Sequence, residues 1–383
     1  MRAVFIAGAG LIPVGEHWDN SLRELALDAV EAAQKDAARQ GADGFRFEAL
    51  FVGNMLASEL SHQAHLGALI ADFAGMRGIE AATVEAAGAS GGAALRQAVL
   101  AVGSGMVETA LVVGVEKMTD KVGAAVLAAA ATAADSDWES AQGVTPAALA
   151  ALIMRRYLHE HKVALKDFAG FSVNAHANAK TNPNAMFRGA ITAEAYVKAG
   201  MVSDPINVFD SAPDADGAAA LIVTAAPARV RIAASTMATD ALAVHDRLDM
   251  LTFEAARLSA ARAYETAGIG LDDVDLFELH DAFTVFAALS LEAAGFAERG
   301  QGWRLAGGEI ALTGRIPIST FGGLKARGNP GGAAGVYQAA EVVLQLRGAA
   351  GPNQVRDARW GMAQCLGGAG ASAVTHIFER VTP

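Results

Sequence analysis

Cysteine is almost absent from this chain of 383 residues, in which Cys365 is the single example. One thiol cannot form an internal disulfide, so the cysteine usage gives no sign of an oxidising compartment. Long hydrophobic runs are also missing, because the longest, residues 122–134, is shorter than the roughly 20 residues that a membrane-spanning helix needs. The apolar residues 3–7 predict a first strand and not a signal sequence, because a Gly-Pro turn follows them. We therefore expect a cytoplasmic protein without a membrane span.

Positive charge is also scarce, since the formal net charge is −11. Nucleic acid is therefore not expected as a partner, because binding to phosphate groups along a strand requires a basic face. Hydrophobic residues make up 52% of the chain and charged residues 19%, which is typical of a protein that buries a large interior. A chain of this length suits two domains of ordinary size.

Predicted strands and helices alternate along the chain, which favours an α/β fold with parallel pairing and crossover helices. The clearest helix begins at Ser21, because Ser21 and Glu24 form a capping box. Seven apolar residues on one face follow at helical spacing: Leu22, Leu25, Ala26, Ala29, Val30, Ala33 and Ala37. Residues 2–8 predict a first strand, and its Gly8-Ala9-Gly10 ending is interpreted as a structural turn because the third glycine of a dinucleotide fingerprint is missing.

Residues 119–210 interrupt this alternation with an Ala-rich run, a helix and a polar stretch. We interpret the segment as an excursion that covers a site. An internal repeat is also suggested, because Gly91-Gly92-Ala93-Ala94 and Gly331-Gly332-Ala333-Ala334 each open a predicted helix. Two related halves packed together would explain both the chain length and this repeat.

The segment Val84 to Leu95 predicts a strand that turns sharply into a helix. Such a turn brings the backbone close to a ligand and points the unpaired N–H groups of the first helical turn at it, which suits anions and oxyanions. In many enzymes the apex of such a turn has a Ser or Cys nucleophile. Here the apex is Gly88, which has no side chain.

Three further candidate sites lie in the second half of the chain. A buried strand ends at His280, and carboxyl ends of strands are where open α/β sheets bind ligands. A glycine-rich loop that includes Gly322, Gly323 and Asn329 leads into a helix and predicts a site of backbone donors. Cys365 precedes a glycine turn, where it is either a small buried residue or a thiol acid/base.

Taken together, these segments resemble the thiolase superfamily, in particular the branch of the sterol-carrier-protein-x thiolases and the archaeal acetoacetyl-CoA thiolases. The resemblance covers essentially the whole chain. It rests on Glu85 to Gly92, Gly114 to Asp120, Asn182 to Ala185, Asp214 to Ala220, His280 to Phe283, Gly322 to Gly335 and Cys365 to Gly368.

The resemblance implies a thiolase fold, in which two similar βαβαβαββ halves pack as αβαβα layers with an inserted loop domain. The expected halves are residues 1–225, with the loop domain at about 119–210, and residues 226–383. It also implies a homodimer, a coenzyme A thioester as substrate, and a small zinc-ribbon/OB-fold protein as partner. No resident cofactor or metal is expected, because the chain has no ligand cluster of its own and His159 and His161 are interpreted as solvated.

By the same resemblance, the family's nucleophilic Cys falls at Gly88, and the His that activates it falls at Asn329. His280 matches a His of this branch, and its pairing with Asn329 resembles the His and Asn that hold a thioester oxygen in ketoacyl synthases. Cys365 matches the acid/base Cys of other thiolases. The backbone N–H groups of Gly88 and Gly367 are expected to form a second oxyanion hole, since such a hole needs no side chain.

Three functions stay open at this point. The first is a thiolase-like acyltransferase that forms or cleaves C–C bonds in 3-oxoacyl-CoA through an enolate. The second is a CoA-dependent aldolase or retro-aldolase acting on β-hydroxyacyl-CoA, which needs no acyl-enzyme and for which Tyr337 is a candidate site residue beside Gly322 and Gly323. The third is a CoA-binding scaffold without catalysis. Gly88 makes the covalent acyl carrier of the first function hard to explain.

Overall fold

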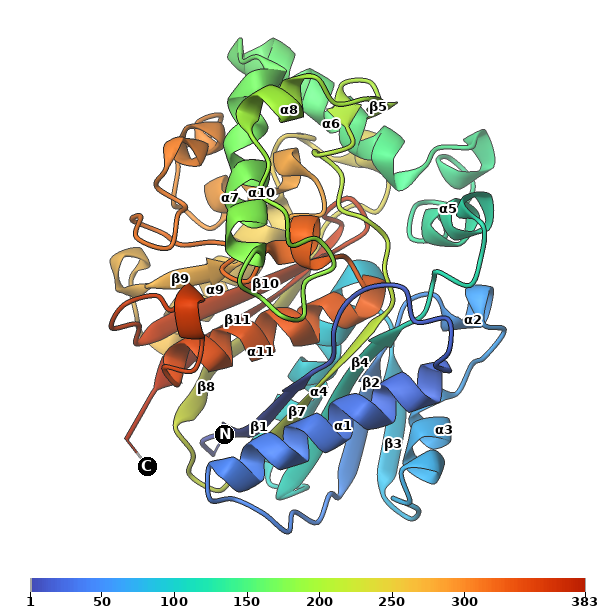
Figure 1. Ribbon diagram of the computed structural model, residues 1–383, viewed down its shortest axis with the longest axis vertical. Helices are drawn as coiled ribbons and strands as arrows, with labels where there is room; N and C mark the ends of the chain where they lie inside the picture. The colour runs from blue at the N-terminus through green and yellow to red at the C-terminus, as the bar shows by residue number, and fades with distance from the viewer. Residues whose placement is uncertain (1, 383) are drawn as a thin grey trace.

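Nine strands form one mixed sheet in the computed structural model, which describes residues 2–382. Their order across the sheet is β3-β2-β4-β7-β1-β8-β11-β10-β9 (Figure 1). The strands are β1 (Phe5–Leu11), β2 (Ala49–Gly53), β3 (Glu80–Val84), β4 (Thr109–Glu116), β7 (Gly217–Thr224), β8 (Val230–Thr239), β9 (Leu276–Glu278), β10 (Trp360–Gly367) and β11 (Ser372–Arg380).

The sheet consists of two half-sheets with the same internal pairing. In the first, β1 and β7 are antiparallel, β7 and β4 are antiparallel, and β4, β2 and β3 are parallel. In the second, β8 and β11, then β11 and β10, are antiparallel, and β10 and β9 are parallel, with a parallel bridge from Phe277 to Ile318 beyond them. A short pairing, Phe5 with Arg231 and Ile6 with Val230, joins the halves. The parallel pairing that the alternation of strands and helices favours is therefore present only for β4, β2 and β3 and for β10 and β9, because β7 and β11 run against their neighbours.

Helices cover both outer faces of this arrangement and fill the space between the half-sheets. The outer helices of the first half are α1 (Leu22–Arg39) and α3 (Leu66–Phe73), and those of the second are α9 (Glu254–Ala267) and α10 (Thr284–Ala293). Between the half-sheets lie α4 (Ser90–Ser104) and α11 (Ala334–Leu346), whose side chains pack on strands of both halves. The five layers α, β, α, β, α confirm the predicted fold class.

The first helix forms where its sequence predicts. Ser21 caps α1, and the Glu24 side chain accepts a hydrogen bond from the Ser21 backbone N–H, so the capping box is present. The seven predicted apolar residues are the buried face of the helix. A Cβ at Gly8 would lie 2.4 Å from the Ala33 oxygen, so this glycine allows α1 to pack closely on β1 and does not form a turn.

Glycine also explains how the two central helices cross. A Cβ on Gly91 would lie 2.8 Å from the Gly332 oxygen, and one on Gly335 would lie 2.4 Å from the Gly92 nitrogen. The backbones of α4 and α11 therefore approach each other more closely than any side chain would permit. The repeated Gly-Gly-Ala-Ala segments lie at this crossing, one at the start of each helix.

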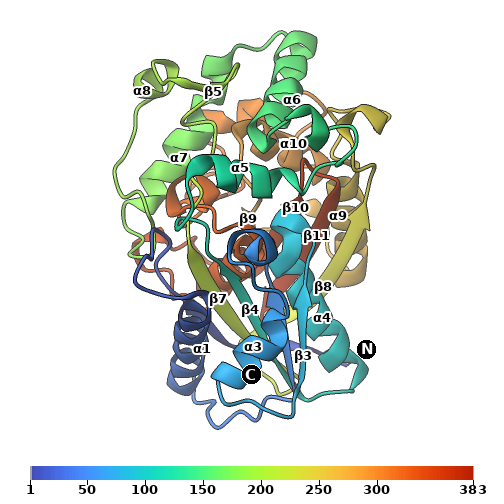
Figure 2. The same ribbon diagram turned by 90° about the vertical axis from the view of Figure 1, so that its right-hand side faces the viewer.

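The connection from β4 to β7 rises above the end of the sheet (Figures 1 and 2). It contains α5 (Gly123–Ala131), α6 (Pro146–His161), α7 (Ala169–Ala179), α8 (Ala193–Val197) and the hairpin of β5 (Met201–Ser203) and β6 (Ile206–Asn207). The short helix α2 (Ala57–Leu60) lies next to α5. Among residues 2–382, no helix combines the length and apolar character that crossing a membrane requires.

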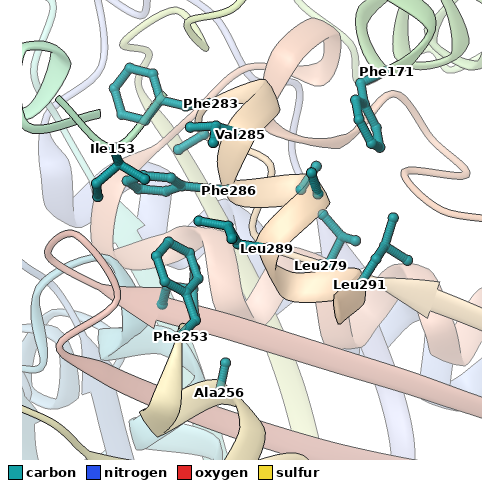
Figure 3. Packing of buried hydrophobic residues seen from close by; sticks show 14 of the residues in the cluster. Ile153, Phe171, Phe253, Ala256, Leu279, Phe283, Val285, Phe286, Leu289 and Leu291 are labelled. Carbon is teal, nitrogen blue, oxygen red and sulfur yellow. The ribbon is translucent and has the colours of Figure 1, made fainter. Parts of the chain in front are cut away.

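The inserted segment shares a core with the second half of the chain. Ile153 of α6 packs near Phe286 of α10, and the Phe286 ring contacts Phe253 at the start of α9, with 5.2 Å between ring centroids (Figure 3). The segment is thereby fixed over the end of the sheet. The expected division of the chain at residues 225 and 226 stays a prediction.

Candidate active site

The turn between β3 and α4 is held in an unusual backbone conformation. Ala87 has a φ of 50°, a left-handed value that costs free energy for a residue with a Cβ. The Ser90 hydroxyl stabilises it, because its Oγ accepts a hydrogen bond from the Ala86 N–H at 2.9 Å and donates one to the Ala87 oxygen at 2.6 Å. The turn presents Gly88 to a cavity, with the N-terminus of α4 directly behind it.

The space that a side chain at position 88 would need is already filled. A Cβ there would lie 2.7 Å from the Leu366 carbonyl oxygen at the end of β10, and 3.0 Å from Cε1 of His280. Backbone atoms cannot rotate away as a flexible side chain can. Any residue other than glycine at this position therefore requires the end of β10 to shift.

His280 follows β9 and is buried beside Gly88. Its Nε2 would be 3.4 Å from a Cβ at position 88, and its Nδ1 has no hydrogen-bond partner among the described residues. Burial, with a smaller effect of the Arg327 charge, lowers the pKa of His280 to about 4. The imidazole is therefore uncharged at neutral pH, and one ring nitrogen can donate a hydrogen bond to a ligand.

Asn329 reaches the same cavity from the loop before α11. Its backbone N–H donates to the Pro213 oxygen at 3.0 Å, and its carbonyl accepts from the Ala215 N–H at 3.2 Å. This pairing fixes the position of the residue. The side-chain oxygen Oδ1 is buried and has no partner within residues 2–382. The backbone of Asn329 is thus held in place, and its side chain lines the cavity, where the amide can bind a ligand.

The cavity has a volume of about 250 Å³ and a clear polarity. Its polar end contains Gly88, His280 and Asn329, together with Ser211 and Asp214. The remaining wall is mainly apolar. Part of it comes from α5, α6 and α10 and includes Phe286 and Leu149, and part comes from other segments, through Met55, Leu56, Met118 and Leu366. A second cavity of about 620 Å³ adjoins the first, and Val202, Ser211, Ala212 and Asp214 line both.

Cys365 does not line the cavity, which corrects the expectation that it acts as an acid/base. Its thiol is buried behind α4, where a Cβ on Gly92 would lie 2.2 Å from Sγ. Burial raises the pKa of the thiol to about 12, so it remains protonated at neutral pH. The sequence showed that a glycine turn follows Cys365 but not that its side chain points into the middle layer.

Tyr337 is also outside the cavity. Its hydroxyl donates to the Ile12 oxygen at 2.9 Å, its ring lies under the Arg327 guanidinium at 4.8 Å, and the side chain is fully buried. Burial raises the pKa of this phenol. The residue ties α11 to the segment after β1, so the expected role in the site is wrong.

The three remaining glycine candidates serve the backbone and do not line either cavity. Gly322 and Gly323 both have positive φ, at 108° and 54°, and a Cβ on Gly323 would lie 2.3 Å from Asp281 Oδ2. They form the tight turn in which the Leu324 N–H donates to Asp281. Gly367 lies in the β10–β11 hairpin, where a Cβ would meet Ser372, and its neighbours Leu366 and Gly368 line the cavity instead.

Two carboxylates that the sequence analysis did not assign contribute to the site. Glu116 is fully buried and accepts hydrogen bonds from the backbone N–H groups of Met55 and Gly332, both at 2.9 Å. It therefore ties a cavity-lining segment of the first half to the start of α11. Burial raises the pKa of Glu116 to about 7.

Asp214 is the second of these carboxylates, and it lines the cavity itself. Asp214 could have been identified from the direction of β7. This strand is antiparallel to β4, with Gly217 opposite Glu116. The start of β7 therefore lies at the same edge of the sheet as the carboxyl end of β4. Sequence reasoning that assumed parallel pairing considered only carboxyl ends.

Comparison with known proteins matches this arrangement over the whole chain. Residues 4–226 match the family model "Thiolase, N-terminal domain", and residues 236–380 match "Thiolase C-terminal domain-like". An acetyl-CoA acetyltransferase of Methanothermobacter thermautotrophicus is 43% identical over 388 aligned positions, covering 99% of this chain and 100% of the relative. The benzoylsuccinyl-CoA thiolase subunit BbsB of Thauera aromatica is 31% identical, covering 90% and 89%.

Solved structures show the same fold. An aldolase described as Ltp2-ChsH2(DUF35) has a TM-score of 0.82 at 25% identity, covering 99% of this chain and 98% of that one. Human mitochondrial 3-ketoacyl-CoA thiolase in complex with CoA has a TM-score of 0.76 at 17% identity, covering 100% and 98%. This chain belongs to the thiolase family. It is a thiolase-like enzyme.

Proposed function

We propose that this protein acts on CoA thioesters through an enolate and without an acyl-enzyme, as an aldolase or retro-aldolase on β-hydroxyacyl-CoA. The observation that supports this most directly is Gly88. At the turn where a thiolase needs its nucleophile, the chain has no side chain, and the Leu366 oxygen lies where a Cβ would be. No thiol lines the cavity within the described residues, and its single hydroxyl, on Ser211, donates to the Ala212 oxygen at 3.3 Å.

Retro-aldol cleavage uses the groups that are present. The substrate loses the proton of its β-hydroxyl, the bond between the α- and β-carbons breaks, and its electrons form the enolate of the thioester while an aldehyde or ketone leaves. The developing negative charge is on the thioester oxygen. His280 and Asn329 can donate hydrogen bonds to it, and one such donor contributes about 2.7–4 kcal/mol to transition-state stabilisation in favourable cases.

The electrostatics of the site favour this role for His280. Burial lowers the pKa of His280 to about 4, so its imidazole is neutral at neutral pH. A neutral imidazole can donate a hydrogen bond to the oxyanion and keep its own proton. The N-terminus of α4 lies behind Gly88 and adds a favourable potential for an anion. A preorganised, partly dehydrated oxyanion site of this kind suits an enolate better than it suits a neutral ground state.

The comparisons support both this proposal and an alternative. One of the structural relatives at full coverage is described as an aldolase. The relatives called acetyl-CoA acetyltransferase, at 43% and 36% identity, favour instead the thiolysis of 3-oxoacyl-CoA. That reaction stores an acyl group on the enzyme, and we infer that Gly88 occupies the position where this family has its nucleophile. A third alternative is a protein that binds CoA as a scaffold and has no turnover, and the assay described below distinguishes it from the two enzymes.

We also propose two protein partners. Strand β3 lies at the end of the sheet, pairs only with β2 among the described strands, and is accessible along its length, so a second copy could pair with it to form a homodimer. The aldolase relative contains a second component described as DUF35. A small zinc-ribbon/OB-fold protein would correspond to that component here, and it would bring any zinc itself.

The test is a side-by-side assay of the protein with short and branched β-hydroxyacyl-CoA substrates and with 3-oxoacyl-CoA plus free CoA. We expect release of an aldehyde or ketone, detected as its hydrazone, together with an equal amount of acyl-CoA. Intact mass after incubation with acetyl-CoA is expected to show no adduct. CoA-dependent cleavage of 3-oxoacyl-CoA by the parent protein would show that the interpretation of Gly88 is wrong, and CoA binding without either turnover would favour the scaffold.

A further inference from the structure

Asp214 is the one carboxylate among the described residues that line the cavity with Gly88, His280 and Asn329. It also lines the adjoining larger cavity, so it lies where the two spaces meet. The residue is exposed to solvent. A ligand that extends from one cavity into the other would pass this carboxylate.

The backbone on both sides of Asp214 is firmly held. Asp216, two residues further on, is buried and accepts hydrogen bonds from the Met118 N–H at 2.6 Å, the Thr119 hydroxyl at 2.6 Å and the Lys117 ammonium at 3.1 Å. Asp214 itself forms a parallel β-bridge with Asn329. The carboxylate is therefore presented by a rigid segment directly beside one of the two oxyanion donors.

No structural role accounts for the Asp214 side chain. Within residues 2–382 its carboxylate accepts no hydrogen bond and forms no ion pair, whereas Asp216 and Glu116 nearby have several partners each. Desolvation by the surrounding protein raises the pKa of Asp214, and the exposure of the side chain to solvent reduces this effect. A carboxylate of raised basicity, without partners and facing a cavity is a suitable general base.

We propose that Asp214 is the catalytic acid/base of this enzyme and transfers the proton between the β-hydroxyl and the α-carbon. This inference rests on the proposed function. Asp214 as carboxylate removes the hydroxyl proton, the bond between the α- and β-carbons breaks, and the carbonyl product and the thioester enolate form. Asp214, now protonated, gives the same proton to the α-carbon, which yields acyl-CoA and restores the carboxylate. One substrate gives two products, and no other reactant is needed.

Other candidate proton carriers fit this step less well. Cys365 and Tyr337 are buried outside the cavity, and both have pKa values raised by burial. His280 has a pKa lowered to about 4, which makes it a weak base and leaves it suited to donate to the oxyanion. The division of roles is then clear: His280 and Asn329 hold the oxygen, and Asp214 moves the proton.

The test compares the parent protein with Asp214→Asn and Asp214→Glu in two assays. The first is carbonyl release from β-hydroxyacyl-CoA, and the second is deuterium uptake by propionyl-CoA in D₂O, which needs only enolate formation. Because general acid–base catalysis contributes about 100- to 10,000-fold, we expect Asp214→Asn to lower kcat and the uptake rate at least about 100-fold. KM should change less than about threefold, and Asp214→Glu should recover part of the rate.

Asp43→Asn is the matched control, because it removes the same charge from an exposed residue that does not line the cavity, and it should keep full activity. The unfolding temperature should not fall in Asp214→Asn, since the carboxylate has no partner to lose and its raised pKa disfavours the charged form in the folded state. A rate for Asp214→Asn within threefold of the parent would overturn the assignment.

The two proposals fail in different ways. If the parent exchanges deuterium but releases no carbonyl product, the aldolase function is wrong while the uptake assay still decides the role of Asp214. If the parent does neither, both proposals are overturned.

Discussion

The two halves of this protein have the same strand pairing, yet they contribute differently to the cavity. Each half has a turn of small residues that opens a central helix, at Ala87–Ala89 before α4 and at Gly331–Ala333 before α11. At its helix start the first half presents backbone only, at Gly88, whereas the second half supplies the side-chain donors His280 and Asn329. The Asp214 carboxylate also comes from the first half, but from the segment before β7. Duplicated architecture thus provides two similar helix starts, and the residues next to each decide whether backbone or side chains reach the ligand.

Buried polar contacts keep the two halves in register at this point. The Glu116 carboxylate, from the end of β4, accepts a hydrogen bond from the Gly332 N–H at 2.9 Å. His376, from β11, approaches the Gly92 oxygen at 3.1 Å through Nε2. Each contact joins one half to the helix start of the other, so the geometry of the cavity depends on both.

The largest expected effect comes from removing the side-chain donors of the second half. Asn329→Ala and His280→Ala should each lower kcat about 100- to 1000-fold, because a lost oxyanion donor costs about 2.7–4 kcal/mol of transition-state stabilisation. Steady-state kinetics of carbonyl release would measure this. Met55→Leu, a volume-conserving change in the cavity wall of the first half, should stay within about threefold. A loss of kcat in Met55→Leu as large as that in Asn329→Ala would contradict the assignment of the oxyanion donors to the second half.

The next effect is a pH-dependent loss of stability through His376. Burial lowers the pKa of His376 to about 4, against about 6.5 in the unfolded chain. Below pH 6.5 the unfolded state therefore binds the proton more readily, and stability falls as the pH decreases from 6.5 to 4, by up to about 3 kcal/mol. Urea unfolding at pH 7 and pH 5 should show that His376→Gln loses less stability than the parent over this interval.

The comparison of His376→Gln with the parent isolates the effect of His376 on stability. This is necessary because buried carboxyl groups change the free energy of unfolding in the opposite direction as the pH falls. Burial raises the pKa of Glu278 to about 8, so its contribution to stability increases as the pH falls towards 4.5. His245→Gln is the control, since its side chain is 54% exposed. An identical pH dependence in His376→Gln and the parent would refute the prediction.

A smaller effect is expected for a side chain on the backbone-only turn. Gly88→Ala should lower the free energy of unfolding by about 1–3 kcal/mol, because its Cβ would lie 2.7 Å from the Leu366 oxygen and the end of β10 must shift. Gly123→Ala is the control, because a Cβ there meets nothing within 4 Å and alanine favours the helix. Denaturant midpoints of the two variants measure this difference. Equal midpoints for Gly88→Ala and the parent would show that the turn can accommodate a side chain.

The smallest expected effect on activity is that of Cys365. Cys365→Ala should leave kcat within about threefold of the parent and cost roughly 1 kcal/mol of stability, since the thiol packs between layers and does not reach the cavity. The same kinetic assay and a denaturant midpoint measure both quantities. A 100-fold loss of kcat with an unchanged midpoint would place the thiol at the reacting carbon after all.

Much of the fold could be predicted because its signals are local. The capping box at Ser21 and the apolar spacing after it define α1 and its buried face, and both are properties of adjacent residues. The turn at Gly88 and the positions of His280 and Asn329 next to element ends were predicted in the same way. Whether these three perform the predicted catalysis stays a prediction, although the structure brings them to one cavity.

What the sequence by itself determined is thus the alternation of elements, the thiolase resemblance and the absence of a side chain at position 88. The tertiary structure decided which of the remaining candidates meet. Asp214 reaches the cavity because β7 runs antiparallel to β4, and Cys365 does not because its side chain faces the middle layer. Strand direction and the side of a sheet on which a residue lies depend on distant partners, and no pattern of neighbouring residues specifies them.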